Sequence, residues 1–301
     1  MFPIIPATSA TDSANQEGIF FSGNFKVGYT NLVSDAGVVS SDVAAVGTGR
    51  QAPAGCEYGS DTGIFGFGYE AAPTGYTAIT NLVSNTGVVA TDTAGVGTAR
   101  QELSACSYGG DKGIFGFGTT GSSTGVTNLV SNAGVVSTDV AGVGTGRQGI
   151  GSCEYGSDKG IFGFGSGPTN TTNLVSNAGV VSTDVAGVGT ARRYIKACSY
   201  GDDKGIFGFG WVSAGNNYMD ISNLVSNAGV VATDTAGVGS VRMMPGATQY
   251  GGDKGIFGYG DGGPGVGYIS LSNLVSDVGV ISTDVAGVGT ARGYLAACSF
   301  N

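Results

Sequence analysis

The chain of 301 residues contains no histidine. This absence removes the side chain that most often acts as a general acid or base, which is also the commonest metal ligand. An active site needs a unique set of groups, whereas nearly every carboxylate recurs along this chain. The sequence therefore predicts a protein without catalysis, cofactor or metal, although a few acids fall outside the recurring pattern, among them Glu17, Glu70, Glu102, Asp220 and Asp261.

Charge is also scarce, because charged residues make up 12% of the chain and the formal net charge is −9. Nucleic-acid binding and attachment to an anionic membrane both need a basic surface, so neither partner is expected. No apolar run approaches the roughly 20 residues of a membrane-spanning helix. The start, MFPIIPATSATDSANQ, lacks the basic region of a signal peptide, so we expect no membrane insertion and no general secretory export.

Proline occurs seven times and tryptophan once, but glycine occurs 58 times, nearly three times its usual share of about 7%. The glycines show no Gly-X-Y period, which excludes collagen, and the hydrophobic content of 41% argues against a disordered chain. Glycines between short β-branched and aromatic runs are typical of many turns that join many short strands. The composition therefore predicts an all-β protein.

One segment of 45 to 50 residues is written six times along the chain. The asparagine of its NLVS core stands at Asn31, Asn81, Asn128, Asn173, Asn223 and Asn273. A period of this size is typical of a propeller, a solenoid or an array.

In the second repeat we predict strands over 63–67, 76–84, 88–96 and 104–108, joined by glycine turns. A four-stranded sheet this small cannot bury both faces alone, so such units stack around an axis. The sequence predicts a six-bladed β-propeller with four-stranded blades over residues 17–301. The ACSY-type strand is missing before Gly18 and present at Ala296–Asn301, so we expect the last strand to complete the first blade and close the ring.

Residues 1–16 belong to no repeat. Phe2, Ile4 and Ile5 make a short apolar segment there, followed by a polar stretch rich in threonine, serine and asparagine. One interpretation is a frayed terminus. The other is a docking arm that binds a neighbouring subunit.

The five cysteines each occupy the same place in their repeat, where the fifth repeat has Thr248. An odd number at one recurrent position does not make a disulfide framework, so we expect small buried side chains on an inner strand. The GGDK-type turns supply one aspartate each, too few oxygens for calcium, so no metal site is expected. The cysteines are Cys56, Cys106, Cys153, Cys198 and Cys298.

An aspartate precedes an arginine by eight residues in every repeat. A charged residue that recurs once in every blade is expected to have a structural role. We therefore interpret these pairs as ion pairs that hold the fold together, within or between blades. Alternatively, the aspartates cap nearby turns. The pairs are Asp42 and Arg50, Asp92 and Arg100, Asp139 and Arg147, Asp184 and Arg192, Asp234 and Arg242, and Asp284 and Arg292.

Because strands alternate in direction, the GGDK and SNTG turns should share one face, which is nearly identical in every repeat. The loop after GIFGF and the segment after each arginine should share the other face, where the repeats differ. Loops on a rigid scaffold are where binding sites concentrate, although unconstrained drift would also make loops vary. Aromatic and basic side chains there are the candidate binding residues: Trp211, Tyr218, Tyr69, Tyr76, Arg193 and Tyr194.

Read from its arginine, the unit GTARQELSACSYGGDKGIFGFG (97–118) resembles the kelch repeat, in which an arginine, a small-residue strand, a glycine turn and an aromatic–aliphatic strand follow one another. One glycine stands here (Gly68, Gly118, Gly165) where kelch repeats have two, and the late kelch tryptophan is absent. The resemblance spans residues 17–301 and implies a kelch-like propeller.

The GIFGFG and NLVSNTGVV cores are also similar to glycine-rich repeat proteins of tailed-phage virions. That similarity implies a non-enzymatic structural or adhesion subunit of a virus particle, in a tail, fibre or capsid-associated position, and is compatible with several copies in the assembly. Its partners would be other virion subunits or a host-surface glycan or receptor. The alternative is a free lectin-like or scaffold propeller of cellular origin, cytoplasmic or extracellular without a secretory signal. A hydrolase with its site at the channel mouth is the third possibility.

Overall fold

The computed structural model describes residues 17–300 apart from positions 45 and 72–74. The predicted docking arm with Phe2, Ile4 and Ile5 lies outside the described residues. No helix in the described part of the chain is long and apolar enough to cross a membrane.

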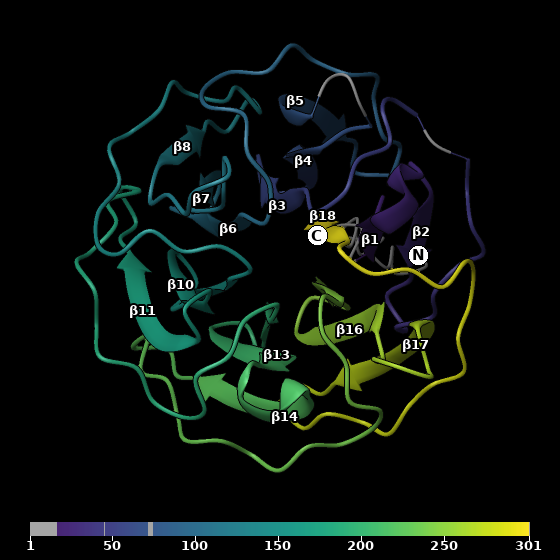
Figure 1. The fold of residues 1–301 in the computed structure, drawn as a ribbon. Coiled ribbons are helices and arrows are strands. Elements are labelled where there is room, and N and C mark those ends of the chain that lie inside the picture. Colours follow the sequence, from purple (N-terminus) through teal and green to yellow (C-terminus); the bar gives the residue numbers. More distant parts are fainter. Residues whose placement is uncertain (1–16, 45, 72–74, 301) are drawn as a thin grey trace, which may run out of the picture.

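The described chain is all-β, as predicted, and forms six three-stranded antiparallel sheets. Figure 1 shows the sheets placed around a common centre, an arrangement like that of a β-propeller. Two short 3₁₀ turns, η1 (Asn24–Lys26) and η2 (Ala214–Asn216), interrupt the connecting loops. We number the sheets 1 to 6 in the order of their middle strands.

Each sheet contributes one strand of each of three kinds. The innermost strands, which contact one another around the centre, are β18 (Ala296–Phe300), β3 (Ala54–Tyr58), β6 (Ser104–Tyr108), β9 (Gly151–Tyr155), β12 (Lys196–Tyr200) and β15 (Gly246–Tyr250). The middle strands are β1 (Glu17–Phe21), β4 (Thr62–Tyr69), β7 (Lys112–Gly116), β10 (Lys159–Gly165), β13 (Lys204–Val212) and β16 (Lys254–Asp261). The third strands are β2 (Thr30–Val33), β5 (Tyr76–Val83), β8 (Thr127–Val130), β11 (Thr169–Val175), β14 (Asn217–Val225) and β17 (Tyr268–Val275).

The predicted fourth strand is not present as a regular strand. In the second repeat the segment 88–96 meets β5 through two isolated bridges, Val83 to Val89 and Thr80 to Thr93, and the Ala90 amide donates to the Leu82 carbonyl at 2.8 Å. Side chains supply part of the remaining pairing in this segment. In the third repeat the Ser137 hydroxyl accepts the amide hydrogen of Leu129 at 2.9 Å, which interrupts a continuous ladder.

Strand β18 pairs antiparallel with β1, so that Cys298 lies opposite Ile19. The end of the chain (yellow in Figure 1) thus lies beside its start (purple) in sheet 1. The predicted completion of the first sheet by the last strand is confirmed. At the seam β1 is therefore paired on both sides, by β18 and by β2.

The alternation of glycine and aromatic residues in the middle strands packs neighbouring sheets together. The Phe67 and Phe115 rings of sheets 2 and 3 meet edge to face with centroids 5.1 Å apart. A Cβ atom on Gly66 would stand 2.9 Å from the Phe115 ring, closer than packed carbon atoms approach. Glycine is therefore required where the next sheet lays a ring against this strand.

The six arginines of the Asp–Arg pattern are fully buried between sheets. The Arg100 guanidinium lies 4.3 Å from the Phe67 ring of sheet 2. It donates hydrogen bonds to the Phe117 carbonyl and to Asn128 Oδ1 of sheet 3, both at 2.8 Å. Each of the six arginines thus lies against a ring of the neighbouring sheet, and most of their N–H groups donate to oxygen, the exceptions being Arg50 Nη2 and Arg242 Nε.

The aspartates act across the same junctions, so the ion pairs join adjacent repeats and not the two residues eight positions apart. Direct pairs are Arg147 with Asp184 at 3.5 Å, Arg192 with Asp234 at 3.8 Å and Arg292 with Asp42 at 3.4 Å. The last of these pairs spans the seam of the ring.

The aspartates also act as caps, as the alternative interpretation held, but on the preceding repeat. Asp139 accepts hydrogen bonds from the amide and the hydroxyl of Thr98. Burial alone would raise the pKa of Asp139, but hydrogen bonds from Thr98 and Asn128 outweigh it and hold the pKa below its usual value.

Candidate functional site: the variable loop face

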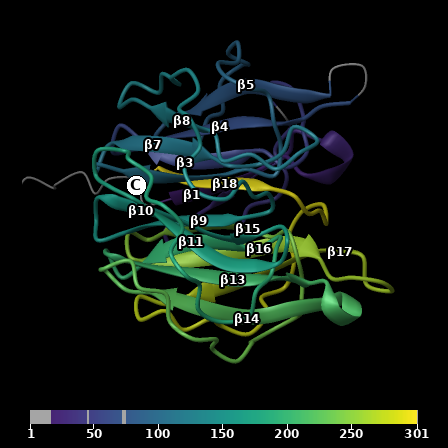
Figure 2. The same ribbon diagram turned by 60° about the vertical axis from the view of Figure 1, so that its left-hand side comes forward.

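The two faces of the disc differ as the sequence predicts. In Figure 2 the two 3₁₀ turns, which lie in the loops after middle strands, project on the right, away from the C-terminal end of β18. On the opposite, repeated face the two turns of four repeats bind each other; for example, Asn132 donates to Asp111 at 3.1 Å, and Asn177 to Asp158 at 3.1 Å. Over the described residues no group of three or more carboxylates and cysteines could hold a metal ion.

All five cysteines are buried and outside disulfides, which confirms their predicted place on the innermost strands. Each sulfur packs on the first glycine of the next middle strand; a Cβ on Gly113 would stand 2.5 Å from Cys56 Sγ. Burial raises the pKa of the Cys56 thiol to about 12, so it stays protonated and unreactive at neutral pH.

Four of the six predicted binding residues gather on sheet 5. Trp211 and Tyr218 stand opposite each other across β13 and β14. The Arg193 guanidinium lies 4.5 Å from the Trp211 ring and 4.7 Å from the Tyr194 ring. A cation between two ring faces holds this group in one arrangement.

The other two predicted residues form a second group on sheet 2. Tyr69 and Tyr76 face each other across β4 and β5, with centroids 5.3 Å apart and planes at 79°. Lys26 from sheet 1 places its Nζ 4.6 Å from the Tyr69 ring and donates to the Glu70 carbonyl oxygen at 2.9 Å.

Residues that were not among the predicted binding residues stand between these two groups. Phe25, whose side chain is 70% exposed, meets Tyr268 of sheet 6 edge to face at 5.6 Å. Tyr294 of the seam meets Tyr194 at 6.0 Å. We call the whole set the aromatic arc: Trp211, Tyr218, Arg193, Tyr194, Tyr294, Tyr268, Phe25, Lys26, Tyr69 and Tyr76.

The aromatic arc covers sheets 5, 6, 1 and 2 only. The corresponding loops of sheets 3 and 4, over 119–125 and 166–171, contain threonine, serine, glycine, asparagine and proline without an aromatic ring. The variable face is therefore asymmetric. The letters of 121–125, GSSTG, match a hydrolase nucleophile motif, but no helix follows this loop and the chain lacks histidine, so the motif has neither its strand–turn–helix setting nor its usual base.

At the centre of this face six residues, one from each repeat, close a ring of backbone hydrogen bonds. The amide of each donates to the carbonyl of the preceding one, at 2.7 to 3.2 Å, and the Tyr294 carbonyl accepts from Ala52 to complete the circle. All have positive φ, between 51° and 63°, which five of them adopt without being glycine. The six are Ala52, Glu102, Gly149, Tyr194, Met244 and Tyr294.

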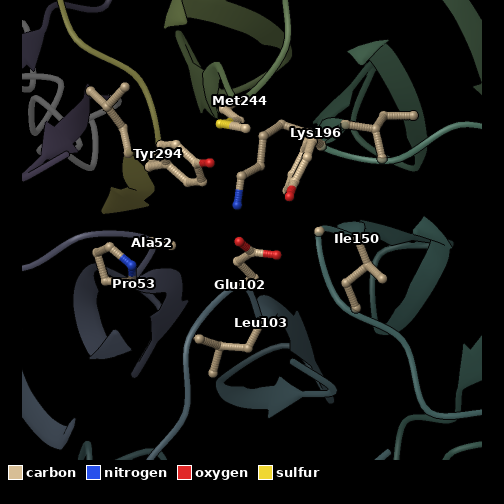
Figure 3. A pocket seen from close by; sticks show the side chains of 12 residues that line it. Ala52, Pro53, Glu102, Leu103, Ile150, Lys196, Met244 and Tyr294 are labelled. Atoms are coloured by element: carbon tan, nitrogen blue, oxygen red, sulfur yellow. The ribbon is translucent and has the colours of Figure 1, made fainter. Parts of the chain in front are cut away.

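A cavity lies within this ring; Tyr194 and Tyr294 line it, and its charged side chains are Glu102 and Lys196. Figure 3 shows the two side chains reaching toward each other across the cavity, with Tyr294 beside them. Lys196 begins β12, at the position where the other innermost strands begin with alanine, serine or glycine. Sequence reasoning missed this lysine, although its departure from the repeat could have identified it.

Burial shifts the pKa values of both Lys196 and Glu102 in the direction that favours the neutral form. It lowers the pKa of the Lys196 amine to about 8, against a smaller opposing effect of Glu102. It also raises the pKa of Glu102, although Arg193 and Lys196 act in the opposite direction. Glu102 Oε2 is buried and accepts no hydrogen bond from the described residues. Of the described residues that line this cavity, Lys196 and Glu102 are the charged ones, and both side chains are partly exposed.

A scan against protein-family models finds no match to this chain, and a search of the curated proteins finds no similar one.

Proposed function

We propose that the chain is a non-enzymatic adhesion or structural subunit, a six-bladed kelch-like propeller that binds a partner protein or a host-surface glycan through the aromatic arc. The observation that carries this proposal is the asymmetry of the variable face. Rings and cations gather over four sheets, while the other two sheets present small polar loops on the same scaffold.

The chemistry of the arc supports such a contact. Tyrosine and tryptophan supply large contact areas at a low cost in conformational entropy, and their polar tips still bond to water or a ligand. Arg193 and Lys26 each lie over a ring of the arc, which reduces the freedom these side chains would lose on binding. A partly polar, aromatic surface suits the faces of sugar rings as well as a protein partner.

The setting that we propose is a virus particle, for which the similarity to repeat proteins of tailed-phage virions is the support. Sedimentation of native source material, followed by mass spectrometry of the fractions, tests it. Recovery only in the particle-sized fraction supports a virion subunit. Recovery at the monomer size contradicts it and favours the free lectin-like propeller.

The contact surface is tested separately, with purified chain on an array of surface glycans and with particle fractions as the protein partner. Changing Trp211→Ala together with Tyr69→Ala should weaken binding at least about tenfold, because central aromatic anchors carry most of an interface's free energy. The matched control is Thr120→Ala with Ser122→Ala, two exposed side chains in the polar loop of sheet 3, which should bind like the unchanged chain. Binding that survives the aromatic changes would exclude the arc as the contact.

A further inference from the structure

The cavity at the centre of the variable face contains an amine that the adhesion function does not use. Of the six lysines in the chain, four lie in GxDK-type turns on the repeated face and Lys26 lies in a loop. Lys196 alone lies on an innermost strand, and within the described residues no hydrogen bond or ion pair engages its Nζ.

The walls around this amine are apolar. Leu103, Ile150, Ile195, Met244 and Leu295 are all buried and line the cavity together with the stem of Lys196. An ammonium ion loses hydration in such surroundings, so the neutral amine is favoured. Desolvation in a hydrophobic pocket is a recognised way to make a lysine nucleophilic at neutral pH.

Glu102 adds a proton donor and acceptor on the other side of the cavity (Figure 3). Its buried Oε2 has no hydrogen-bond partner among the described residues, which leaves it available to a group placed between it and Lys196. A nucleophilic amine that faces a carboxyl group is the pair of groups that imine formation needs.

We propose that Lys196 captures the carbonyl group of a small aldehyde at the axial mouth as a reversible imine, with Glu102 as its proton relay. The Nζ lone pair attacks the carbonyl carbon, and one amine proton passes to the oxygen to give a carbinolamine. Glu102 protonates the hydroxyl, which leaves as water, and takes back the remaining nitrogen proton from the iminium. Aldehyde and amine thus give imine and water, with no change of oxidation state and with Glu102 restored.

The size of the site limits the ligand. The cavity has a volume of about 20 Å³, which holds a water molecule and leaves little more room. Lys196, Glu102 and Tyr294 are all partly exposed, so solvent reaches the cavity. We therefore expect an unhindered aldehyde whose carbonyl end enters while the rest of the molecule stays outside.

The test uses the full chain, propanal as probe and cyanoborohydride to trap the imine at pH 7.5, with the modified lysines located by mass spectrometry. Lys112, Lys159, Lys204 and Lys254 are internal controls, because their side chains are 41–42% exposed and paired with aspartate. Lys196 should be modified at least about tenfold faster than each control, since far more of its amine is neutral at this pH. Modification of Lys196 no faster than that of the turn lysines overturns the proposal.

Two further measurements separate a nucleophile from a lysine that only fills the channel. The rate of Lys196 modification should level off above about pH 8, where its amine is mostly neutral, while the turn lysines continue to react faster up to pH 10. Glu102→Gln should slow Lys196 modification several-fold and leave the turn lysines unchanged, with folding checked by circular dichroism. An unchanged Lys196 rate in Glu102→Gln removes Glu102 from the reaction. Neither measurement depends on what the aromatic arc binds.

Discussion

The repeated face and the variable face are built from the same six segments, but they use repetition in opposite ways. On the repeated face Asn132 and Asp111, and their counterparts in other repeats, make the same turn contacts. On the variable face the same six backbone positions carry alanine, glutamate, glycine, tyrosine, methionine and tyrosine in one hydrogen-bonded ring. Because the backbone alone makes the hydrogen bonds of this ring, its six side chains can differ from repeat to repeat. The positions where they differ are the candidates for a functional role.

The largest effect on stability is expected from removing one of the strands that every repeat contains. Deleting residues 296–301 removes β18, the innermost strand of sheet 1, and exposes the paired edge of β1. We expect the single cooperative thermal transition to be lost, because each sheet depends on its neighbours for burial. Circular dichroism during heating measures this, with removal of Asn301 alone as control. A sharp, unchanged transition in the larger deletion would show that the seam does not close the ring.

A smaller effect is expected from one repeated side chain inside the junctions. Arg100→Ala leaves Asn128 Oδ1 and the Phe117 carbonyl without their buried donors and removes a charge from the Phe67 ring. The free energy of unfolding should fall by about 3–5 kcal/mol, as when one partner of a buried charged network is removed.

The control for this change is Lys112→Ala, which removes an exposed ion pair with Asp111 on the repeated face. Its free energy of unfolding, measured by urea denaturation, should equal that of the unchanged chain. Equal stability of the Arg100 and Lys112 variants would mean that the junction arginines do not hold the sheets together.

The arrangement of the sheets could be predicted from the repeats because each copy shows the same pattern. Period, turn glycines and the missing strand before Gly18 led to six sheets, the closure by β18 and the division into two faces. The fourth strand was wrong because the outer segment bonds through serine and asparagine side chains, as at Ser137, which a pattern of β-branched residues does not reveal.

The candidate site was predicted only in part. Trp211, Tyr69 and their neighbours were found because rings in variable loops stand out. Which rings share a group depends on loops that meet from different repeats, as Phe25 meets Tyr268, and no local pattern encodes that. Likewise, the aspartate and the arginine of one repeat lie at different junctions between sheets, as Arg292 pairs with Asp42 of another repeat. The spacing of residues along the chain does not reveal which side chains of neighbouring sheets meet.

The smallest effect is expected on the repeated face, at a position where the repeats carry either glutamate, glutamine or serine. Glu154 lines a cavity of about 60 Å³ there with the cysteines and with its counterpart Glu57, whereas the adjacent repeats have Ser107 and Ser199. Burial, with a further contribution from Asp158, raises its pKa to about 7.

A carboxyl with a raised pKa in the folded state adds no penalty below its unfolded pKa of about 4.5; the penalty grows as pH rises from about 4.5 to about 7 and is complete above 7. Glu154→Gln should therefore match the unchanged chain at pH 4 and exceed its free energy of unfolding by about 1–3 kcal/mol at pH 8. Thermal unfolding between pH 4 and pH 9 measures the difference. A gap that stays constant across this range would mean that the glutamate is solvated there, and that its charge costs the fold no stability.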